Sequence, residues 1–270
     1  MLKDITLGQY FPGNSIAHKL DPRTKILLVT LYIIALFSAK GWMGYAVMAV
    51  TLAACVKVSH VGLRALVRGL KPLVFIIAFT GILNMFFTPD THYLWEWGIL
   101  RVSVKGIENA LFMVIRIMLL VMGTFLMTYT TSPIRLTDGL ESLLNPLKKI
   151  HVPVHELAMM MTIALRFIPT LIEETEKIMN AQKARGAMLD NGSMMERVKA
   201  LVPVLIPLFI SAFRRADELA MAMECRCYRG GDGRTRLKVL RCTRQDYIDL
   251  AVCIVCFMVI LSSRLVFPNF

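Results

Sequence analysis

Five apolar runs separate polar connections along the chain. They cover residues 26–39, 42–56, 72–88, 110–131 and 247–267. A helix that crosses a bilayer needs about 20 apolar residues, within a range of about 17 to 25. The first two runs reach this length only if the flanking Lys25, Lys40 and Lys57 extend toward the membrane surface. The pattern therefore predicts an all-α integral membrane protein with about five transmembrane helices.

Local signals mark the ends of the first two predicted helices. Asp21 precedes Pro22, the order expected of an N-cap residue followed by proline at the first helical position. Lys40 and Gly41 alone separate the first run from the second. We therefore expect these two spans to form a tight helical hairpin.

The region from 132 to 244 follows a different pattern. Its apolar residues recur with helical periodicity between charges and prolines, which is typical of amphipathic helices and not of membrane spans. We predict three such helices, the first beginning at Ser132-Pro133 and the others running over about Val154–Arg185 and Met195–Cys227. Gly186 is placed to end the second. These helices are inserted before the last span.

Composition and charge predict the orientation. The chain has 31 Lys and Arg against 19 Asp and Glu, a net charge of +12, with 56% hydrophobic residues. This hydrophobicity excludes a disordered chain and argues against an ordinary soluble domain. Most basic residues precede the first run, lie between the second and third, or fall in the amphipathic region, so the positive-inside rule places the N-terminus and that region in the cytoplasm. We predict about four spans in 1–131, a cytoplasmic region at 132–244 and a final span in 245–270.

The cysteines do not form a recognisable framework. Cys253 and Cys256 lie within an apolar run, where small thiols fit helix packing. Cys225 and Cys227 are too close in sequence to supply two ligands of one zinc ion without further Cys or His nearby. No apolar segment with a cleavage site precedes the first run, so we expect no cleaved signal peptide. We predict no disulfide framework, no metal site and no cofactor bound by this chain.

Three other polar residues are candidates for a functional role. His151 and His155 have i, i+4 spacing, but Pro153 lies between them and no acidic third ligand is near in sequence. They are interpreted as loop histidines. Arg116 lies within the fourth apolar run, where it must face other helices or polar neighbours. It is interpreted as a structural tie between helices.

Two segments of the amphipathic region repeat each other weakly. Glu176–Gly186 aligns with Asp217–Cys227, which places Arg185 opposite Arg226. Each arginine ends a long helix between small residues, which are Ala184 and Gly186 in the first segment and Cys225 and Cys227 in the second. A guanidinium left uncrowded in this way can enter a groove on another protein and bind carboxylates through its planar fork. The residues equally fit two cations placed favourably at helix C-termini.

Three stretches carry a resemblance to a known family. They are GQYFPGNSIAHKLDPRTK, TSPIRLTDGLESLLNPLKKIHVPVHELAMMMTIALRFIPTLIEETEKIMNAQKARG and LVPVLIPLFISAFRRADELAMAMECRCYRGG. Together they resemble the transmembrane T component of energy-coupling factor (ECF) transporters, bacterial importers of vitamins and metal ions. The family's hallmark is two Ala-Arg-Gly triplets at the ends of coupling helices. Ala184-Arg185-Gly186 matches the first, and Cys225-Arg226-Cys227 keeps the arginine of the second.

The resemblance implies a scaffold and coupling subunit of a vitamin importer in the bacterial cell membrane. Two ABC ATPases, A and A', would each receive one coupling-helix end, with Arg185 and Arg226 in acidic grooves. The same helices would support a membrane-embedded substrate-binding S component. ATP and magnesium would be bound by the ATPases, so this chain would not be an enzyme. Consistently, the sequence contains no GxxxxGK[ST] phosphate loop.

Other classes of protein remain as alternatives. A membrane-embedded enzyme lacks a recognisable constellation of catalytic residues in this sequence. The permease subunit of a conventional ABC importer would also use cytoplasmic coupling helices, but it would line a substrate pathway of its own. A nucleic-acid partner is not predicted, because acids are interleaved with bases between 133 and 244 and leave no basic stripe.

Overall fold

The computed structural model describes residues 10–88, 93–97, 100–187, 193–231, 233, 240 and 242–266. The regular secondary structure of the described residues is helical except for one antiparallel hairpin, in which β1 (Tyr93–Trp97) pairs with β2 (Leu100–Ser103). The predicted helical class is confirmed, and the hairpin is an addition that the apolar pattern did not predict.

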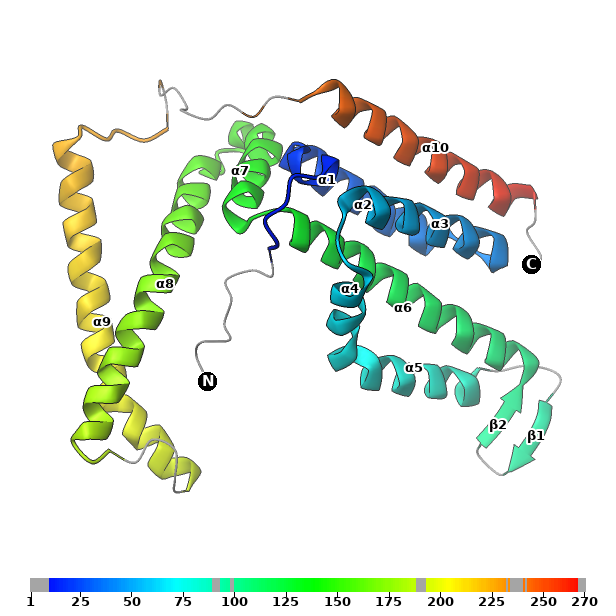
Figure 1. Ribbon diagram of the computed structural model, residues 1–270, viewed down its shortest axis with the longest axis horizontal. Helices are drawn as coiled ribbons and strands as arrows, with labels where there is room; N and C mark the ends of the chain where they lie inside the picture. Colours follow the sequence, from blue (N-terminus) through cyan, green and yellow to red (C-terminus); the bar gives the residue numbers. More distant parts are fainter. Residues whose placement is uncertain are drawn as a thin grey trace. The chain divides into compact units, whose positions relative to one another are not determined.

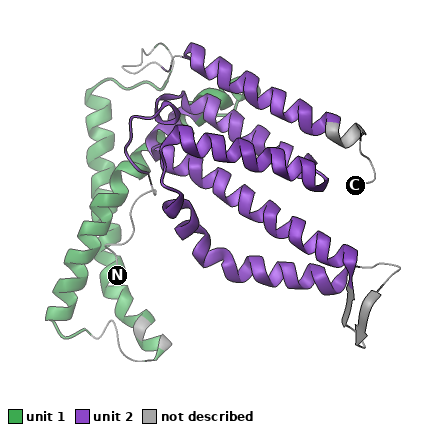
Figure 2. Ribbon diagram, turned by 45° about the vertical axis from the view of Figure 1, so that its right-hand side comes forward, with its two compact units in different colours: residues 1–7, 140–238 green, residues 8–139, 239–270 purple. Residues whose placement is uncertain are grey.

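The chain divides into two compact units, shown in Figure 2. The larger unit contains Gly8–Gly139 and Val239–Phe270, and the smaller contains Leu140–Lys238 with Met1–Leu7. The larger unit therefore joins helices from the first half of the chain to its last helix.

Helices of the larger unit, labelled in Figure 1, include the apolar runs. They are α1 (Ile16–Lys19), α2 (Pro22–Ser38), α3 (Gly41–Ser59), α4 (Leu63–Leu70), the 3-10 turn η2 (Lys71–Leu73), α5 (Val74–Phe87), α6 (Val104–Thr130) and α10 (Arg244–Val266). The Asp21 side chain accepts a hydrogen bond from the Arg23 N–H at 3.0 Å, and Pro22 occupies the first helical position. The predicted start of α2 is confirmed, and Gly41 begins α3 after the predicted short link.

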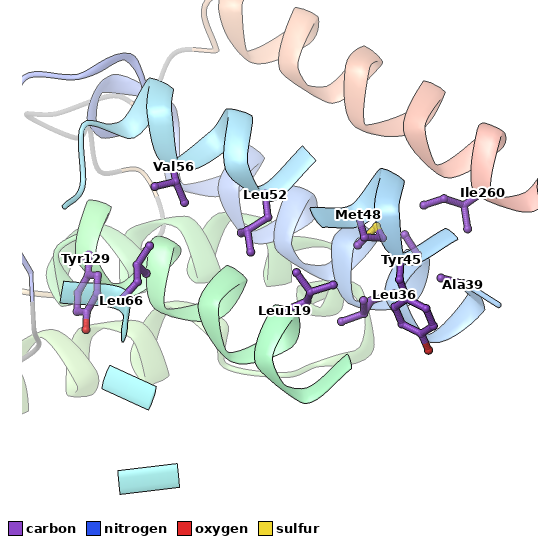
Figure 3. Packing of buried hydrophobic residues seen from close by; sticks show 11 residues of the cluster. Leu36, Ala39, Tyr45, Met48, Leu52, Val56, Leu66, Leu119, Tyr129 and Ile260 are labelled. Carbon is purple, nitrogen blue, oxygen red and sulfur yellow. The ribbon is translucent and has the colours of Figure 1, made fainter. Parts of the chain in front are cut away.

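Among the described residues, one apolar cluster joins α2, α3, α4, α6 and α10 (Figure 3). Its centre is one face of α3, where Tyr45, Met48, Leu52 and Val56 recur at helical spacing and are buried. Four neighbouring helices supply the other residues labelled in the figure: Leu36 and Ala39 from α2, Leu66 from α4, Leu119 and Tyr129 from α6, and Ile260 from α10.

Among the residues that the structure describes, five helices are long and apolar enough to cross a membrane. They are Gly41–Ser59, Leu63–Phe87, Val104–Thr130, Val154–Ala184 and Arg244–Ser262. Four of them contain predicted runs. The first predicted run lies instead in α2, which has 17 residues and is not among the five. The membrane-capable helix without a predicted run is α8 (Val154–Ala184), which was predicted as amphipathic. Length and composition alone therefore do not distinguish α8 from a membrane span.

Two basic side chains tie helices of the larger unit together. Arg116 of α6 donates from Nε and Nη2 to the Tyr45 hydroxyl at 2.9 and 2.6 Å, which confirms its interpretation as a structural tie. Lys25 at the start of α2 is buried against the end of α6. It is 6% exposed, and its ammonium donates to the Thr130 carbonyl and the Thr131 hydroxyl at 2.9 and 3.0 Å. Lys25 thus satisfies acceptors at the C-terminal end of α6.

The smaller unit is built on two long helices. Its elements are the end of α7 (Pro133–Leu144), the 3-10 segment η3 (Asn145–Ile150), α8 (Val154–Ala184) and α9 (Met194–Cys225). All three amphipathic helices thus lie where the sequence predicts them, to within two residues. Ser193 and Glu196 form a capping box at the start of α9, a local reason for its first turn.

Helices α8 and α9 pack against each other in opposite directions (Figure 1). Arg215 donates from Nη2 to Glu174 Oε2 at 2.6 Å, and Gln182 Nε2 donates to the Pro203 carbonyl at 3.5 Å. Glu174 thus pairs with a later residue of α9 than Gln182 does. The two helices therefore run antiparallel.

Candidate functional site

The first candidate arginine lies at the end of α8. Arg185 is the C-cap, and Gly186 follows it with a φ of 88°. The Gly186 N–H donates to the Lys183 carbonyl at 3.0 Å, and the Ala187 N–H donates to the Gln182 carbonyl at 3.0 Å. This pair of bonds is a Schellman motif, in which a left-handed residue ends the helix. Gly186 therefore has the terminating role predicted for it.

The second candidate arginine ends α9 with the same geometry. Arg226 is the C-cap, the Cys227 N–H donates to the Glu224 carbonyl at 2.8 Å, and the Tyr228 N–H donates to the Met223 carbonyl at 3.0 Å. Both hydrogen bonds correspond to those at the first end. The weak sequence repeat thus corresponds to a repeated backbone structure.

Cys227 takes the place that glycine has at the first end. Its φ is 53°, within the left-handed region that residues with a Cβ enter at a cost of about 1–2 kcal/mol. The substitution therefore changes the energy of the second helix end and not its shape.

Both guanidinium groups are available to a partner. Arg185 and Arg226 are exposed, as are their neighbours Ala184, Cys225 and Cys227. Among the described residues, neither arginine side chain has a hydrogen-bond or ion-pair partner. The small neighbours leave each cation projecting from a helix end that is fixed by backbone hydrogen bonds.

The crossing of α8 and α9 places the two arginines far apart. Gln182, one turn before Arg185, contacts Pro203. Arg226 lies 23 positions beyond Pro203 on α9, which at 1.5 Å per residue is about 34 Å. One small groove cannot accept both cations, so the arrangement suits two separate partner sites.

One side of α9 exposes large apolar residues. They are Leu201, Val202, Leu205, Ile206, Phe209, Ile210 and Phe213. Seven such side chains within three to four turns form a larger apolar surface than scattered exposed residues do.

The structure corrects the interpretation of His155. It lies in the first turn of α8 and not in a loop, and its Nδ1 is 3.0 Å from Glu141 Oε1. An acidic partner was missed because Glu141 is 14 residues away and becomes a neighbour only when α7 and α8 fold together. His151 ends η3 with a φ of 61°. Within the described parts of the chain, no group of three His, Cys, Asp or Glu side chains could hold a metal ion.

The membrane-capable helices define a class, the multi-pass membrane protein. Residues 13–237 match the CbiQ family model, described as a cobalt transport protein. The chain is 53% identical over 267 residues to the energy-coupling factor transporter transmembrane protein EcfT of Ruminiclostridium cellulolyticum, covering 99% of this chain and 100% of the relative. It is 46% identical to EcfT of Bacillus subtilis over 91% of this chain and 93% of that protein. The chain therefore belongs to the family of energy-coupling factor transporter transmembrane proteins, which confirms the resemblance inferred from the sequence.

Proposed function

We propose that this chain is the coupling subunit of an ECF-type vitamin importer and transmits the motion of two ABC ATPases to a membrane-embedded S component. The observation that carries the proposal is the pair of exposed arginines on equivalent Schellman ends of α8 and α9. Each arginine docks in an acidic groove of one ATPase. The chain itself is not catalytic, because ATP and magnesium belong to the ATPases.

The charge of α8 supports a cytoplasmic position for the coupling helices. Glu173, Glu174, Glu176 and Lys177 lie in its second half, and Glu174 forms an ion pair with Arg215 of α9. A bilayer core would penalise four charges within five residues. This cost supports a place for the second half of α8 outside the bilayer core, and the distribution of basic residues supports the cytoplasmic side for the coupling region and the N-terminus.

The apolar face of α9 supports the assignment of a further partner. Exposed large residues from Leu201 to Phe213 need cover from a lipid or protein surface. The S component supplies this cover and carries the substrate specificity. The alternative, a conventional ABC permease, is disfavoured because the similar proteins compared above bear the name of the energy-coupling factor component.

Charge reversal at the two arginines tests the proposal. Arg185→Glu and Arg226→Glu each remove one half of an interfacial charge pair, a loss of about 2–5 kcal/mol. We expect ATPase affinity to fall roughly 30-fold or more for each variant, as this energy implies. The measurements are recovery of both ATPases with the tagged chain and ATP-dependent vitamin uptake.

Matched controls separate docking from general charge. Lys177→Glu and Arg214→Glu reverse exposed charges on the same two helices away from their ends, and both are expected to retain the ATPases. If the double variant at Arg185 and Arg226 still recovers both ATPases and supports normal uptake, the coupling role is wrong. Recovery of a second permease in place of an S component would favour the conventional importer.

A further inference from the structure

A polar cluster lies beside the second arginine end and joins three segments of the smaller unit. Glu141 comes from the end of α7, His155 from the first turn of α8, and Tyr228 from the chain that leaves α9. Tyr228 and His155 are 73 residues apart in sequence. The docking role of the arginines does not require this cluster.

Both ring nitrogens of His155 have a hydrogen-bond partner. His155 Nδ1 is 3.0 Å from Glu141 Oε1, and the Tyr228 hydroxyl is 3.4 Å from His155 Nε2. A carboxylate accepts hydrogen bonds, so Glu141 assigns the proton of the neutral ring to Nδ1. Nε2 is then the acceptor for the Tyr228 hydroxyl. The three groups form a chain in which each donor faces an acceptor.

Gly231 brings the backbone of the leaving chain onto the same ring. A Cβ at this position would collide with His155 Cδ2, so a side chain cannot be added without moving one of the two segments. The chain after α9 therefore contacts His155 twice, through the Tyr228 hydroxyl and through the Gly231 backbone. These contacts fix the first residues beyond the helix end against the start of α8.

The contacts act on Arg226 through a short connection. Tyr228 is two residues beyond Arg226, a reach of at most about 7 Å, and its N–H closes the Schellman motif on the Met223 carbonyl. The side chain that binds His155 thus belongs to the residue whose backbone ends α9. At the first end, the equivalent position is Ala187, whose methyl group cannot form such a hydrogen bond.

We propose that Glu141, His155 and Tyr228 form a polar latch that positions the Arg226 end of α9 against the start of α8. The latch makes Arg226 move with the junction of α7 and α8, whereas the Arg185 end is held by its own helix. Its consequence for transport rests on the proposed function, since it makes the two ATPase contacts mechanically unequal. All three residues are positioning residues and do not touch the partner.

The test measures local mobility in the intact chain, without ATPases, by spin labelling. One background keeps Cys225 as the single cysteine, with Cys227 replaced by glycine and the other four by alanine. The matched control places the label at the equivalent position of the first end, Ala184→Cys with Cys225→Ala. Tyr228→Phe and His155→Ala are introduced into each background, and the electron paramagnetic resonance line shape reports label motion.

We expect both variants to increase label motion at position 225 and to leave position 184 unchanged. The equilibrium between held and released ends is expected to shift by up to about tenfold, the effect of one hydrogen bond. The double variant is expected to add nothing to His155→Ala, because Tyr228 then has no ring to bind. His155→Gln, whose amide oxygen can take the place of Nε2, is expected to restore restricted motion.

Three results would overturn the latch: unchanged motion at 225, equal loosening at 184, or additive effects in the double variant. Failure of the latch and failure of the proposed function remain distinguishable, because the label is read without ATPases and the charge reversals are read with them. In the assembled transporter, Tyr228→Phe is expected to lower the amount of vitamin transported per ATP while both ATPases are still recovered. Unchanged transport per ATP would refute the mechanical consequence and leave only a static contact.

Discussion

Asp246 joins the last helix to the first long one, and its replacement gives a direct test of that junction. Its carboxylate accepts hydrogen bonds from the Asp21 N–H at 2.9 Å and from the Thr243 N–H and hydroxyl, both at 2.6 Å. Asp246 is 2% exposed and Asp21 is 5% exposed. One buried carboxylate therefore caps the start of α10 and holds it at the start of α2.

The expected cost follows from the donors left behind. Asp246→Ala leaves the buried Asp21 N–H without an acceptor, which costs about 1–3 kcal/mol. Loss of the cap on α10 adds about 1 kcal/mol. We expect the free energy of unfolding to fall by about 2–4 kcal/mol. Asp246→Asn is expected to cost about half as much, because its amide oxygen still accepts from one side.

The assay is reversible unfolding of the purified chain by titration of detergent micelles with SDS. Asp249→Ala is the matched control, because Asp249 lies about one turn further along α10 and its side chain has no hydrogen bond among the described residues. We expect this control not to destabilise the protein, since it removes a partly buried charge without a partner. If Asp246→Ala and Asp249→Ala unfold at the same midpoint, the junction does not depend on these hydrogen bonds.

Three further changes test other contacts. Tyr45→Phe keeps the ring but removes the oxygen that Arg116 binds, so we expect a loss of about 1–3 kcal/mol in the same unfolding assay. An unchanged midpoint would mean that Arg116 finds another acceptor. Cys227→Gly relieves the left-handed backbone and is expected to stabilise the end of α9 by up to about 1 kcal/mol, seen as slower amide exchange in its last turn. Faster exchange would contradict this account. Glu174 and Arg215 have side chains 22% and 30% exposed, so a double-mutant cycle to Gln is expected to give a coupling below about 1 kcal/mol. A larger value would make this pair a principal support of the crossing.

Local sequence signals predicted the elements of this fold because their causes are local. Asp21 and Pro22 begin α2 through bonds within the first turn, and Gly186 ends α8 through its own backbone freedom. Helical periodicity located α8 and α9 to within two residues. Each signal depends on residues no more than one helical turn apart. It can therefore be recognised in the sequence without knowledge of the fold.

Contacts between distant residues could not be predicted in this way. The Asp21 N–H and the Asp246 carboxylate are 225 residues apart, and no periodicity connects them. The hydrogen bonds of Lys25 to Thr130 and Thr131 were not predicted, because only the packing of α2 against α6 brings these acceptors to it. The partners of His155 were missed for the same reason.

The two arginine ends reach one geometry by different physical means. At the first end, glycine allows the left-handed turn at no steric cost, so the local sequence is sufficient to shape it. At the second end, Cys227 enters the same region at a cost of about 1–2 kcal/mol, which contacts elsewhere must offset. Tyr228 and Gly231 supply such contacts through His155. It follows that a change at the junction of α7 and α8 alters the Arg226 end, while the Arg185 end is insensitive to it.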